Sequence, residues 1–205
     1  MTLELGDAVA LPEPRQAGPL SVEAALSSRR SVRDFAKGPL TLAEVSQLLW
    51  AAQGITDPEG YRAAPSAGAL YPLEVYLVAG EVAALEAGIY KYDPLRHRLT
   101  LMQLGDRRAE LAAAALDQDW MADGAAVLVI AAVPERTERK YGDRANRYVP
   151  MEAGHAAENV YLQAAALGLG TTVVGAFRDA QVKAVVGMAR DERPLCLLPV
   201  GRPAA

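Results

Sequence analysis

The sequence has little of several residue types that build familiar sites. Its 205 residues include one cysteine, Cys196, and two histidines, so an intramolecular disulfide is excluded and a cysteine- or histidine-rich metal site has little support. Lys and Arg number 21 against 25 Asp and Glu, and a net charge of −4 argues against general nucleic-acid binding. No apolar run is long enough to span a bilayer, and Met1 to Pro14 lacks the apolar core of a signal peptide. These absences predict a cytoplasmic protein without a nucleic-acid or membrane partner.

The composition that is present indicates a folded globular protein. Apolar residues make up 51% of the chain, and its length fits one domain with a substantial core. Proline and glycine punctuate the start, which predicts an irregular arm over residues 1–20 and a single domain over residues 21–203. Cys196 lies in an apolar segment and is expected to be a small buried hydrophobe.

Helical and strand patterns alternate along the domain. Ser21 and the capping box that begins at Thr41 open two helices, and a longer helix is expected from Tyr148 to Leu167. Pro150 is expected in the first turn of that long helix, where proline is tolerated. Further helices are expected over residues 105–116 and 179–186, and strands over 74–79, 88–92, 98–103, 125–133, 171–174 and 195–200. The pattern predicts an α+β protein with helices packed on a mixed or antiparallel sheet.

The run from Arg29 to Phe35 is the most informative stretch. It places three arginines and a serine within five residues, at the end of a helical pattern in a net-acidic protein. Arg29, Ser31 and Arg33 alternate, so on extended backbone they would point the same way and form a receptor for a phosphate group. The alternative is a solvated basic helix end, which the helix dipole favours in any case.

A second candidate is the loop from Pro65 to Pro72. Small residues between two prolines, including Ser66, Ala67 and Gly68, leave backbone amides open to a flat ligand. The loop leads into a buried strand, and ligand sites concentrate on such loops. The alternative is an ordinary turn before a strand.

Two further candidates lie near the end of the chain. The glycines from Gly168 to Gly175 close a helix and open a strand, which is the reverse of a dinucleotide-binding loop. Val174, Gly175 and Ala176 at the end of that strand would still expose backbone N–H groups. Arg202 follows the last buried strand, where it would meet a ligand or serve as a terminal charge.

Two polar motifs lie in and before the long helix. Glu152 and His155 have the spacing of half a di-iron site, but the other half is missing, so no metal is expected. Lys140 and Tyr141 are adjacent and could donate and accept a proton if partly desolvated, or they belong to an ordinary charged loop.

Taken in order, these motifs resemble the FMN-dependent nitroreductase superfamily. The Arg29–Phe35 run is similar to its opening phosphate motif, the 65–76 segment to its second loop and strand, Gly168–Phe177 to its flavin-facing segment, and Gly201-Arg202 to its closing phosphate arginine. The form of the loop, together with Lys140-Tyr141, resembles the SagB-type branch, whose members oxidise thiazolines and oxazolines in modified peptides.

The resemblance implies a nitroreductase-like fold and a homodimer with FMN at the subunit interface. It implies that FMN is held by Arg29, Arg30, Ser31, Arg33, Pro65, Ser66, Ala67, Gly68, Val174, Gly175, Ala176 and Arg202, with the 66–68 segment coming from the partner subunit. Arg33 would lie near the ring edge that becomes anionic on reduction. In the SagB-type branch, the Lys-Tyr pair, here Lys140 and Tyr141, is implicated in azoline oxidation.

Three functions follow from the resemblance. The first is an NAD(P)H-fed reductase of small nitro or quinone-like acceptors, working by ping-pong. The second is a dehydrogenase of azoline-like substrates, in which Lys140 and Tyr141 handle the substrate proton. The third is a non-catalytic flavin-binding dimer. The first two are oxidoreductases, and an oxidoreductase is the expected class.

Overall fold

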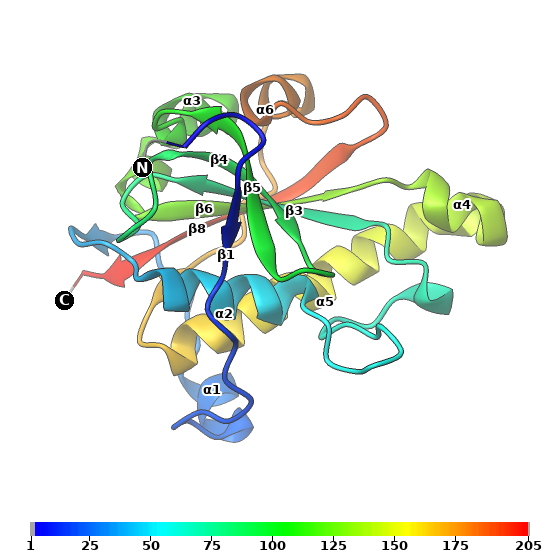
Figure 1. Cartoon of the computed structure of the whole chain (residues 1–205), viewed down its shortest axis with the longest axis horizontal. Coiled ribbons are helices and arrows are strands. Elements are labelled where there is room, and N and C mark those ends of the chain that lie inside the picture. The colour runs from blue at the N-terminus through cyan, green and yellow to red at the C-terminus, as the bar shows by residue number, and fades with distance from the viewer. Residues whose placement is uncertain (1–2, 205) are drawn as a thin grey trace.

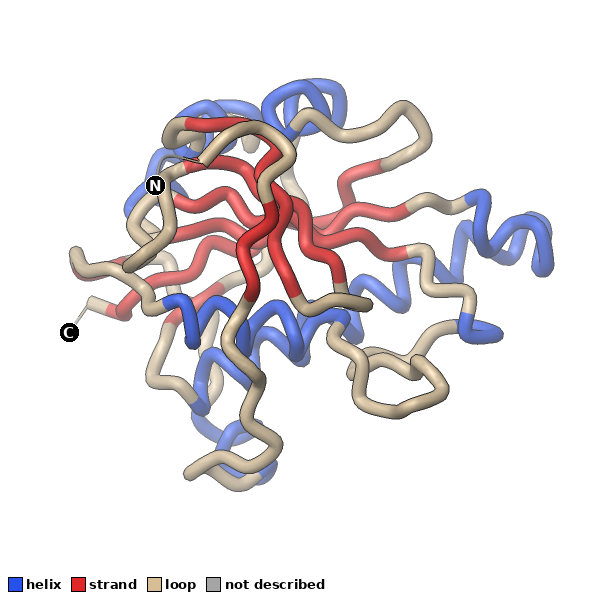
Figure 2. Tube along the Cα trace, in the orientation of Figure 1, coloured by secondary structure: helices blue, strands red, loops and turns tan. Residues whose placement is uncertain are grey.

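The chain is described by a computed structural model over residues 3–204. An open sheet lies through its middle, in the order β1-β5-β4-β3-β6-β8-β2, with β7 pairing beside it on β8 (Figures 1 and 2). Every paired strand in the described residues runs antiparallel to its neighbour. The strands are β1 (Ala8–Ala10), β2 (Phe35–Ala36), β3 (Leu73–Ala79), β4 (Gly88–Asp93), β5 (Arg98–Leu104), β6 (Ala126–Ala132), β7 (Gly170–Thr171) and β8 (Arg193–Pro203).

Helices cover both faces of this sheet. The helices are α1 (Val22–Ser28), α2 (Leu42–Gln53), α3 (Arg108–Ala114), α4 (Glu135–Tyr141), α5 (Ala145–Ala166) and α6 (Asp179–Val186), with short 3₁₀ turns η1 (Ala67–Ala69), η2 (Asp119–Asp123) and η3 (Gly142–Arg144). Val75 and Leu77 of β3 pack with α2 and α5, whereas Tyr76 and Val78 pack with α3 and α6. The period-two alternation of a strand therefore builds one core on each face, and the expected α+β fold is confirmed.

The two capping predictions hold in detail. The Ser21 side chain accepts a hydrogen bond from the backbone N–H of Ala24, and α1 follows directly. Thr41 and Glu44 form a complete capping box at the start of α2, which ends at Gly54 as expected. Each side chain satisfies an N–H group that the first turn of a helix leaves without an intrahelical partner.

The long helix α5 begins earlier than the sequence predicts. Its first residue is Ala145, so Pro150 lies in the second turn and not in the first. The expectation for Pro150 is therefore wrong in position, although the helix continues through it. Pro150 is exposed on α5, and because proline has no N–H it cannot donate to the carbonyl four residues earlier.

Three elements were not predicted. The arm was expected to be irregular, but Ala8–Ala10 forms β1 and covers the edge of β5. Phe35–Ala36 forms β2 on β8. The charged segment after β6 was expected to be a surface loop and is instead α4, whose acidic first turn and basic last turn complement the helix dipole.

The segment after α5 pairs less than expected. β7 has only two residues, and the chain returns to β8 through a single bridge between Val174 and Leu197. The backbone N–H of Val173 donates to the hydroxyl of Tyr161, so a side chain takes the place of a strand partner there.

Other expectations concern burial. Cys196 is buried, as predicted, and burial raises the pKa of its thiol to about 12.

Among the helices of residues 3–204, none combines the length and the apolar character needed to cross a membrane.

Candidate active site

The arginine run leaves the end of α1 and borders a cavity of about 230 Å³. Arg29 and Arg30 line this cavity together with Tyr161 of α5 and Thr171 of β7. Figure 1 shows how this comes about, since α1 lies beside the C-terminal part of α5 although the two are far apart in the sequence. The cavity is therefore lined by two basic residues and two hydroxyl-bearing residues.

Tyr161 organises this end of the site. Its hydroxyl lies 3.1 Å from Ser31 Oγ, donates to Thr172 Oγ1 at 3.2 Å and accepts the N–H of Val173 at 2.8 Å. The Arg29 guanidinium lies over its ring, 5.0 Å from the centroid. Burial opposes ionisation of Tyr161, but these hydrogen bonds and the nearby arginine outweigh it and hold the pKa below the usual 10.0. Tyr161 thus joins the Arg29–Ser31 segment to the β7 segment.

Thr171 carries a buried hydroxyl that the fold leaves unpaired. Its Oγ1 has no hydrogen-bond partner among the described residues, although the residue is only 1% exposed. A buried hydroxyl without a partner is costly, and such groups mark places where a ligand or water completes the site. Because Thr171 lines the same cavity as Arg29, the residues present suit an acceptor-rich anionic group such as a phosphate ester.

The other arginines of the predicted set have different neighbours. Arg30 donates to the carbonyl oxygens of Ser27 and Arg29 and so caps the end of α1. Arg202 forms a two-pronged ion pair with Glu44, with 2.7 Å from Nη1 to Oε1 and 2.9 Å from Nη2 to Oε2. The proline that follows Arg202 lines the cavity, whereas Arg202 itself is held at the start of α2. A role for Arg202 in binding phosphate remains a prediction.

Arg33 and the small residues after β7 lie near a common turn, η2. The Arg33 guanidinium is 6.0 Å from the ring centroid of Trp120 in this turn. Gln118, which precedes the turn, donates to the carbonyl oxygen of Ala176 at 3.1 Å. Gly175 and Ala176 are exposed, and a Cβ added to Gly175 would meet nothing within 4 Å. Val174, by contrast, is buried at its bridge to β8.

The 65–72 loop is tied to the N-terminal half of α5. Glu152 Oε1 accepts the backbone N–H of Ala67 at 2.8 Å, and the Glu152 side chain is almost fully buried. Burial raises the pKa of this carboxyl above its usual 4.5. The spacing of Glu152 from His155 did not reveal this contact between Glu152 and the loop.

Lys140 and Tyr141 lie against the same loop. A Cβ added to Gly68 would lie 2.8 Å from the Tyr141 hydroxyl and 3.0 Å from Lys140 Nζ. Gly68 has a φ of +65°, in the left-handed region that glycine adopts at least cost. The structure therefore brings together two motifs that are about seventy residues apart in the sequence, and glycine leaves room for both side chains.

Tyr71 supports the loop from behind and was missed by the sequence. Its backbone has a φ of +46°, which is unfavourable for tyrosine. Three contacts hold it there: its N–H donates to Ser66 Oγ at 2.9 Å, its carbonyl oxygen accepts from Arg136 at 3.1 Å, and its ring lies 4.5 Å from the Arg62 guanidinium. Two of these contacts lie within the segment before β3, and only the one to Arg136 joins the loop to α4, which no local sequence signal reveals.

The two halves of the predicted site lie apart within one chain. Glu152, which holds the loop, and Tyr161, which holds the arginine segment, are nine residues apart on α5. At about 1.5 Å and roughly 100° per residue, they are separated by about 14 Å along the helix and point to opposite sides of it. One chain thus presents a basic half-site and a loop half-site that do not face each other.

Comparison with known proteins identifies the family. The profile described as the nitroreductase family matches residues 26–202. The chain belongs to the nitroreductase family. A candidate nitroreductase of Methanocaldococcus jannaschii is 50% identical over 183 residues, which cover 89% of this chain and 91% of that protein. A candidate nitroreductase of Ralstonia eutropha has a TM-score of 0.83 at 30% identity, over 100% of this chain and 96% of that one. These findings make the protein an oxidoreductase with a nitroreductase-like fold.

Two further solved structures resemble this nitroreductase-family chain. A chain of the E. coli microcin synthetase complex McbBCD with a truncated pro-microcin has a TM-score of 0.74 at 25% identity, over 96% of this chain and 79% of that one. The NADPH:FMN oxidoreductase of Vibrio harveyi, complexed with NAD⁺, has a TM-score of 0.65 at 21% identity, over 90% of this chain and 69% of that one. The second likeness concerns the fold alone.

Proposed function

We propose that this member of the nitroreductase family is an FMN-dependent oxidoreductase that takes electrons from NAD(P)H and reduces small nitro or quinone-like acceptors. The observation that carries the proposal is the cavity lined by Arg29, Arg30 and Thr171, beside which the Thr171 hydroxyl is buried without a hydrogen-bond partner. The name of the Vibrio harveyi relative, an NADPH:FMN oxidoreductase, supports both the cofactor and the donor.

The residues of this chain have distinct parts in that proposal. Arg29, Ser31 and Thr171 would hold the phosphate end of FMN through charge-assisted and hydroxyl hydrogen bonds. Arg33 and the exposed Gly175-Ala176 segment would border the ring. FMN, when bound, supplies the hydride acceptance and donation, so the protein's contribution is binding, orientation and charge.

A second subunit would complete the site. Ser66, Ala67 and Gly68 lie on the opposite side of α5 from Tyr161, so one chain does not surround a ligand held at Arg29. A two-fold copy would bring the loop half-site of one protomer to the basic half-site of the other, since two-fold symmetry makes each contact occur twice. Light scattering at several protein concentrations tests this homodimer, and a monomer that retains FMN would contradict it.

The visible spectrum of the purified, FMN-loaded protein tests the reaction. Under anaerobic conditions, NADPH and then NADH are added, and we expect one of them to bleach the flavin bands rapidly. The bands should return when a quinone is added, as a ping-pong reductase requires. A flavin that neither nucleotide reduces would contradict the reductase proposal.

A second function is favoured by one contact, the approach of Lys140 and Tyr141 to Gly68. This pair would serve a SagB-type dehydrogenase of azoline-like substrates, in which an amine and a phenol beside the flavin take up the substrate proton. The likeness to a chain of the microcin synthetase complex supports this alternative. Lys140→Ala separates the two functions: it should leave acceptor reduction intact if the protein is a reductase, and abolish azoline oxidation if it is a dehydrogenase.

A further inference from the structure

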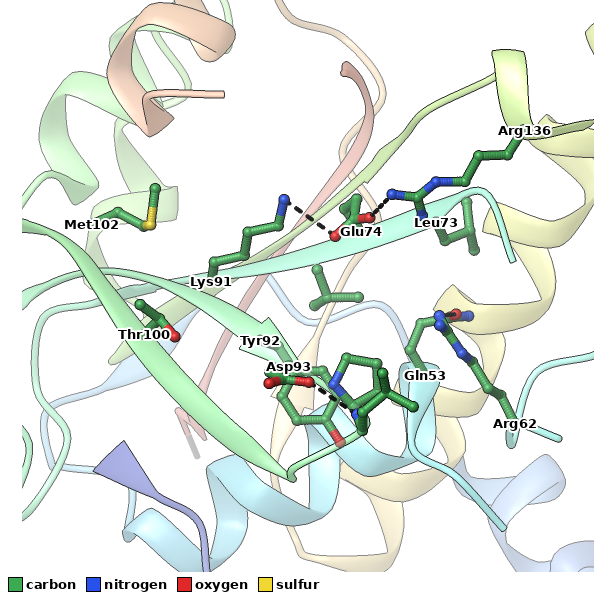
Figure 3. Close-up of a pocket in the computed structure, with 13 residues that line it drawn as sticks. Gln53, Arg62, Leu73, Glu74, Lys91, Tyr92, Asp93, Thr100, Met102 and Arg136 are labelled. Atoms are coloured by element: carbon green, nitrogen blue, oxygen red, sulfur yellow. Dashed lines mark hydrogen bonds and ion pairs between the residues drawn. The ribbon is translucent and has the colours of Figure 1, made fainter. Parts of the chain in front are cut away.

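A gap in the sheet opens a second cavity on the other side of the loop. β3 and β4 pair only from Tyr76 opposite Lys91 to Ala79 opposite Gly88, whereas β4 remains paired with β5 as far as Asp93. The first residues of β3 and the last residues of β4 therefore separate. The cavity between them has a volume of about 400 Å³ and is shown in Figure 3.

The carboxylates that line this cavity already have cationic partners. Glu74 lies between two cations, 3.2 Å from Lys91 Nζ and in a hydrogen bond with Arg136 (Figure 3). Asp93, at the end of β4, pairs with Arg96 at 3.2 Å. The negative charges of the cavity wall are therefore neutralised within the protein.

Arg62 is the lining cation without such a partner. Its Nη1 donates to the amide oxygen of Gln53 at 2.8 Å, and its guanidinium lies over the ring of Tyr71. Within residues 3–204, no carboxylate forms an ion pair with it. Burial lowers the pKa of Arg62 below its usual range, as expected for a cation that is partly withdrawn from water. A guanidinium presents five donors in a planar fork, so most of them remain open to a ligand.

The rest of the wall carries an apolar portion beside the polar side chains of Gln53 and Thr100. In the apolar portion, Leu73 and Val75 come from β3, and Tyr92, Pro94 and Met102 come from β4, the hairpin turn and β5. Apolar side chains beside a few fixed polar groups are typical of small-molecule sites. The volume of the cavity suits a ligand about the size of a single aromatic ring with a short substituent.

We propose that this cavity binds a small organic carboxylate, whose acid group pairs with Arg62 and whose apolar body lies between the start of β3 and the end of β4. The planar fork of Arg62 matches a carboxylate in two parallel hydrogen bonds. The proposed site is separate from the Arg29 cavity. It depends neither on FMN nor on a second subunit.

The test compares an acid with its neutral amide on the full chain as purified. 4-Fluorophenylacetate and 4-fluorophenylacetamide have nearly the same shape, and ¹⁹F NMR reports the binding of each. We expect the acid to bind in the millimolar range or tighter and at least about tenfold more strongly than the amide, which corresponds to one charge-assisted pair. Equal affinities, or no binding of the acid up to solubility, would overturn the proposal.

Location is tested by methionine methyl groups and by substitution. With ¹³C-methyl methionine, the resonance of Met102 should shift on adding the acid, while that of the exposed Met151 on α5 should not. Arg62→Gln should reduce acid binding to the level of the amide, and Arg62→Lys should restore part of it. Arg190→Gln, in the exposed turn after α6 and away from this cavity, is the matched control and should change nothing. The ligand would lie elsewhere if the acid left the Met102 resonance unshifted. The same conclusion would follow if a folded Arg62→Gln variant still bound the acid as the wild type does.

Discussion

The carboxylate of Glu152 accepts the backbone N–H of Ala67 at 2.8 Å, which fixes the proposed flavin-binding loop to the middle of the longest helix. This contact joins residues 85 positions apart and uses a carboxylate that is only 4% exposed. A buried carboxylate is costly unless it is hydrogen bonded, so loop and helix stabilise each other. The position of Ser66, Ala67 and Gly68 therefore depends on α5.

Glu152→Gln should change the pH dependence of stability. Burial raises the pKa of Glu152 in the folded state above 4.5, the usual value that it has in the unfolded chain. Its favourable contribution to the free energy of unfolding is therefore complete below pH 4.5 and is lost as pH rises through the folded-state pKa. The variant, which is always neutral, should therefore gain in unfolding free energy relative to wild type as pH rises above 4.5. Urea unfolding at a series of pH values measures the difference.

The matched control is Glu158→Gln on the same helix, where the carboxylate is 47% exposed and lies 3.9 Å from Arg29 Nε. Its pH profile gives the effect of removing an exposed negative charge, together with that weak ion pair, from α5. If the two variants followed the same profile, the effect assigned to the buried position of Glu152 would be wrong.

Gly68→Ala should reduce activity more than stability. The added methyl would lie 2.8 Å from the Tyr141 hydroxyl and 3.0 Å from Lys140 Nζ, and both are ends of side chains that can move away. The positive φ should cost about 1 kcal/mol, and the displaced pair should lower turnover of any substrate that it contacts. Gly187→Ala, with a φ of +71° and no atom within 4 Å, shares the backbone cost without the clash. Equal turnover in the two variants would contradict a role for the contact.

Tyr161→Phe should weaken both the fold and the binding of FMN. The substitution leaves the N–H of Val173 without its acceptor at 2.8 Å and releases Ser31, so we expect a loss of about 1–2 kcal/mol in unfolding free energy. FMN affinity, measured by quenching of flavin fluorescence, should fall as well. Tyr61→Phe, on an exposed loop, should change neither quantity. Unchanged flavin affinity in Tyr161→Phe would separate Tyr161 from the cofactor site.

Glu192→Gln should be among the most destabilising single substitutions. Glu192 is 2% exposed and accepts from Lys91 Nζ and the Tyr76 hydroxyl, both at 2.5 Å, and from the N–H of Ala189 at 2.9 Å. Breaking this buried pair should cost about 3 kcal/mol at neutral pH. Although burial opposes its ionisation, the hydrogen bonds and Lys91 lower the pKa of Glu192. The contribution of Glu192 to the free energy of unfolding is thus fully present above pH 4.5 and is lost as pH falls through its folded-state pKa.

Urea unfolding of Glu192→Gln at neutral and acid pH checks both statements. The difference in unfolding free energy between Glu192→Gln and wild type should become smaller at acid pH, because Glu192 of the wild type is then protonated and uncharged. Glu110→Gln, which breaks the exposed pair with Arg107, should stay within about 1 kcal/mol of wild type. A difference in unfolding free energy that stayed constant with pH would show that the negative charge of Glu192 is not the source of the stability.

Arg33→Ala should weaken FMN binding and slow flavin reduction. A cation near the ring favours the anionic reduced form, so its loss should cost about tenfold in the rate of reduction by the preferred nucleotide. Stopped-flow absorbance under anaerobic conditions measures this rate. Arg193→Ala removes an exposed arginine paired with Glu135 at 3.8 Å and should leave it unchanged. Full flavin content and full rate in Arg33→Ala would refute the role of Arg33.

The elements that the sequence predicted correctly are those with local signals. The Thr41 capping box, the apolar run of β6 and the short helix α6 depend on neighbours within a few residues, and each lies where it was expected. β1 and β2 were missed because two or three residues carry no detectable period, and their partners β5 and β8 are distant. The arginine run was found for the same local reason, since its charge is concentrated in five residues.

The sequence by itself determined the composition of the two half-sites, namely the arginine run with its serine and the small-residue loop with the Lys-Tyr pair. Only the tertiary structure decided that Tyr161 joins the first, that Glu152 and Tyr71 hold the second, and that Arg202 pairs with Glu44. The physical reason is that hydrogen bonds and ion pairs act over a few ångströms in space, whereas sequence patterns report only neighbours along the chain. The cavity beside Arg62 has the same origin, because it exists only where two strands part.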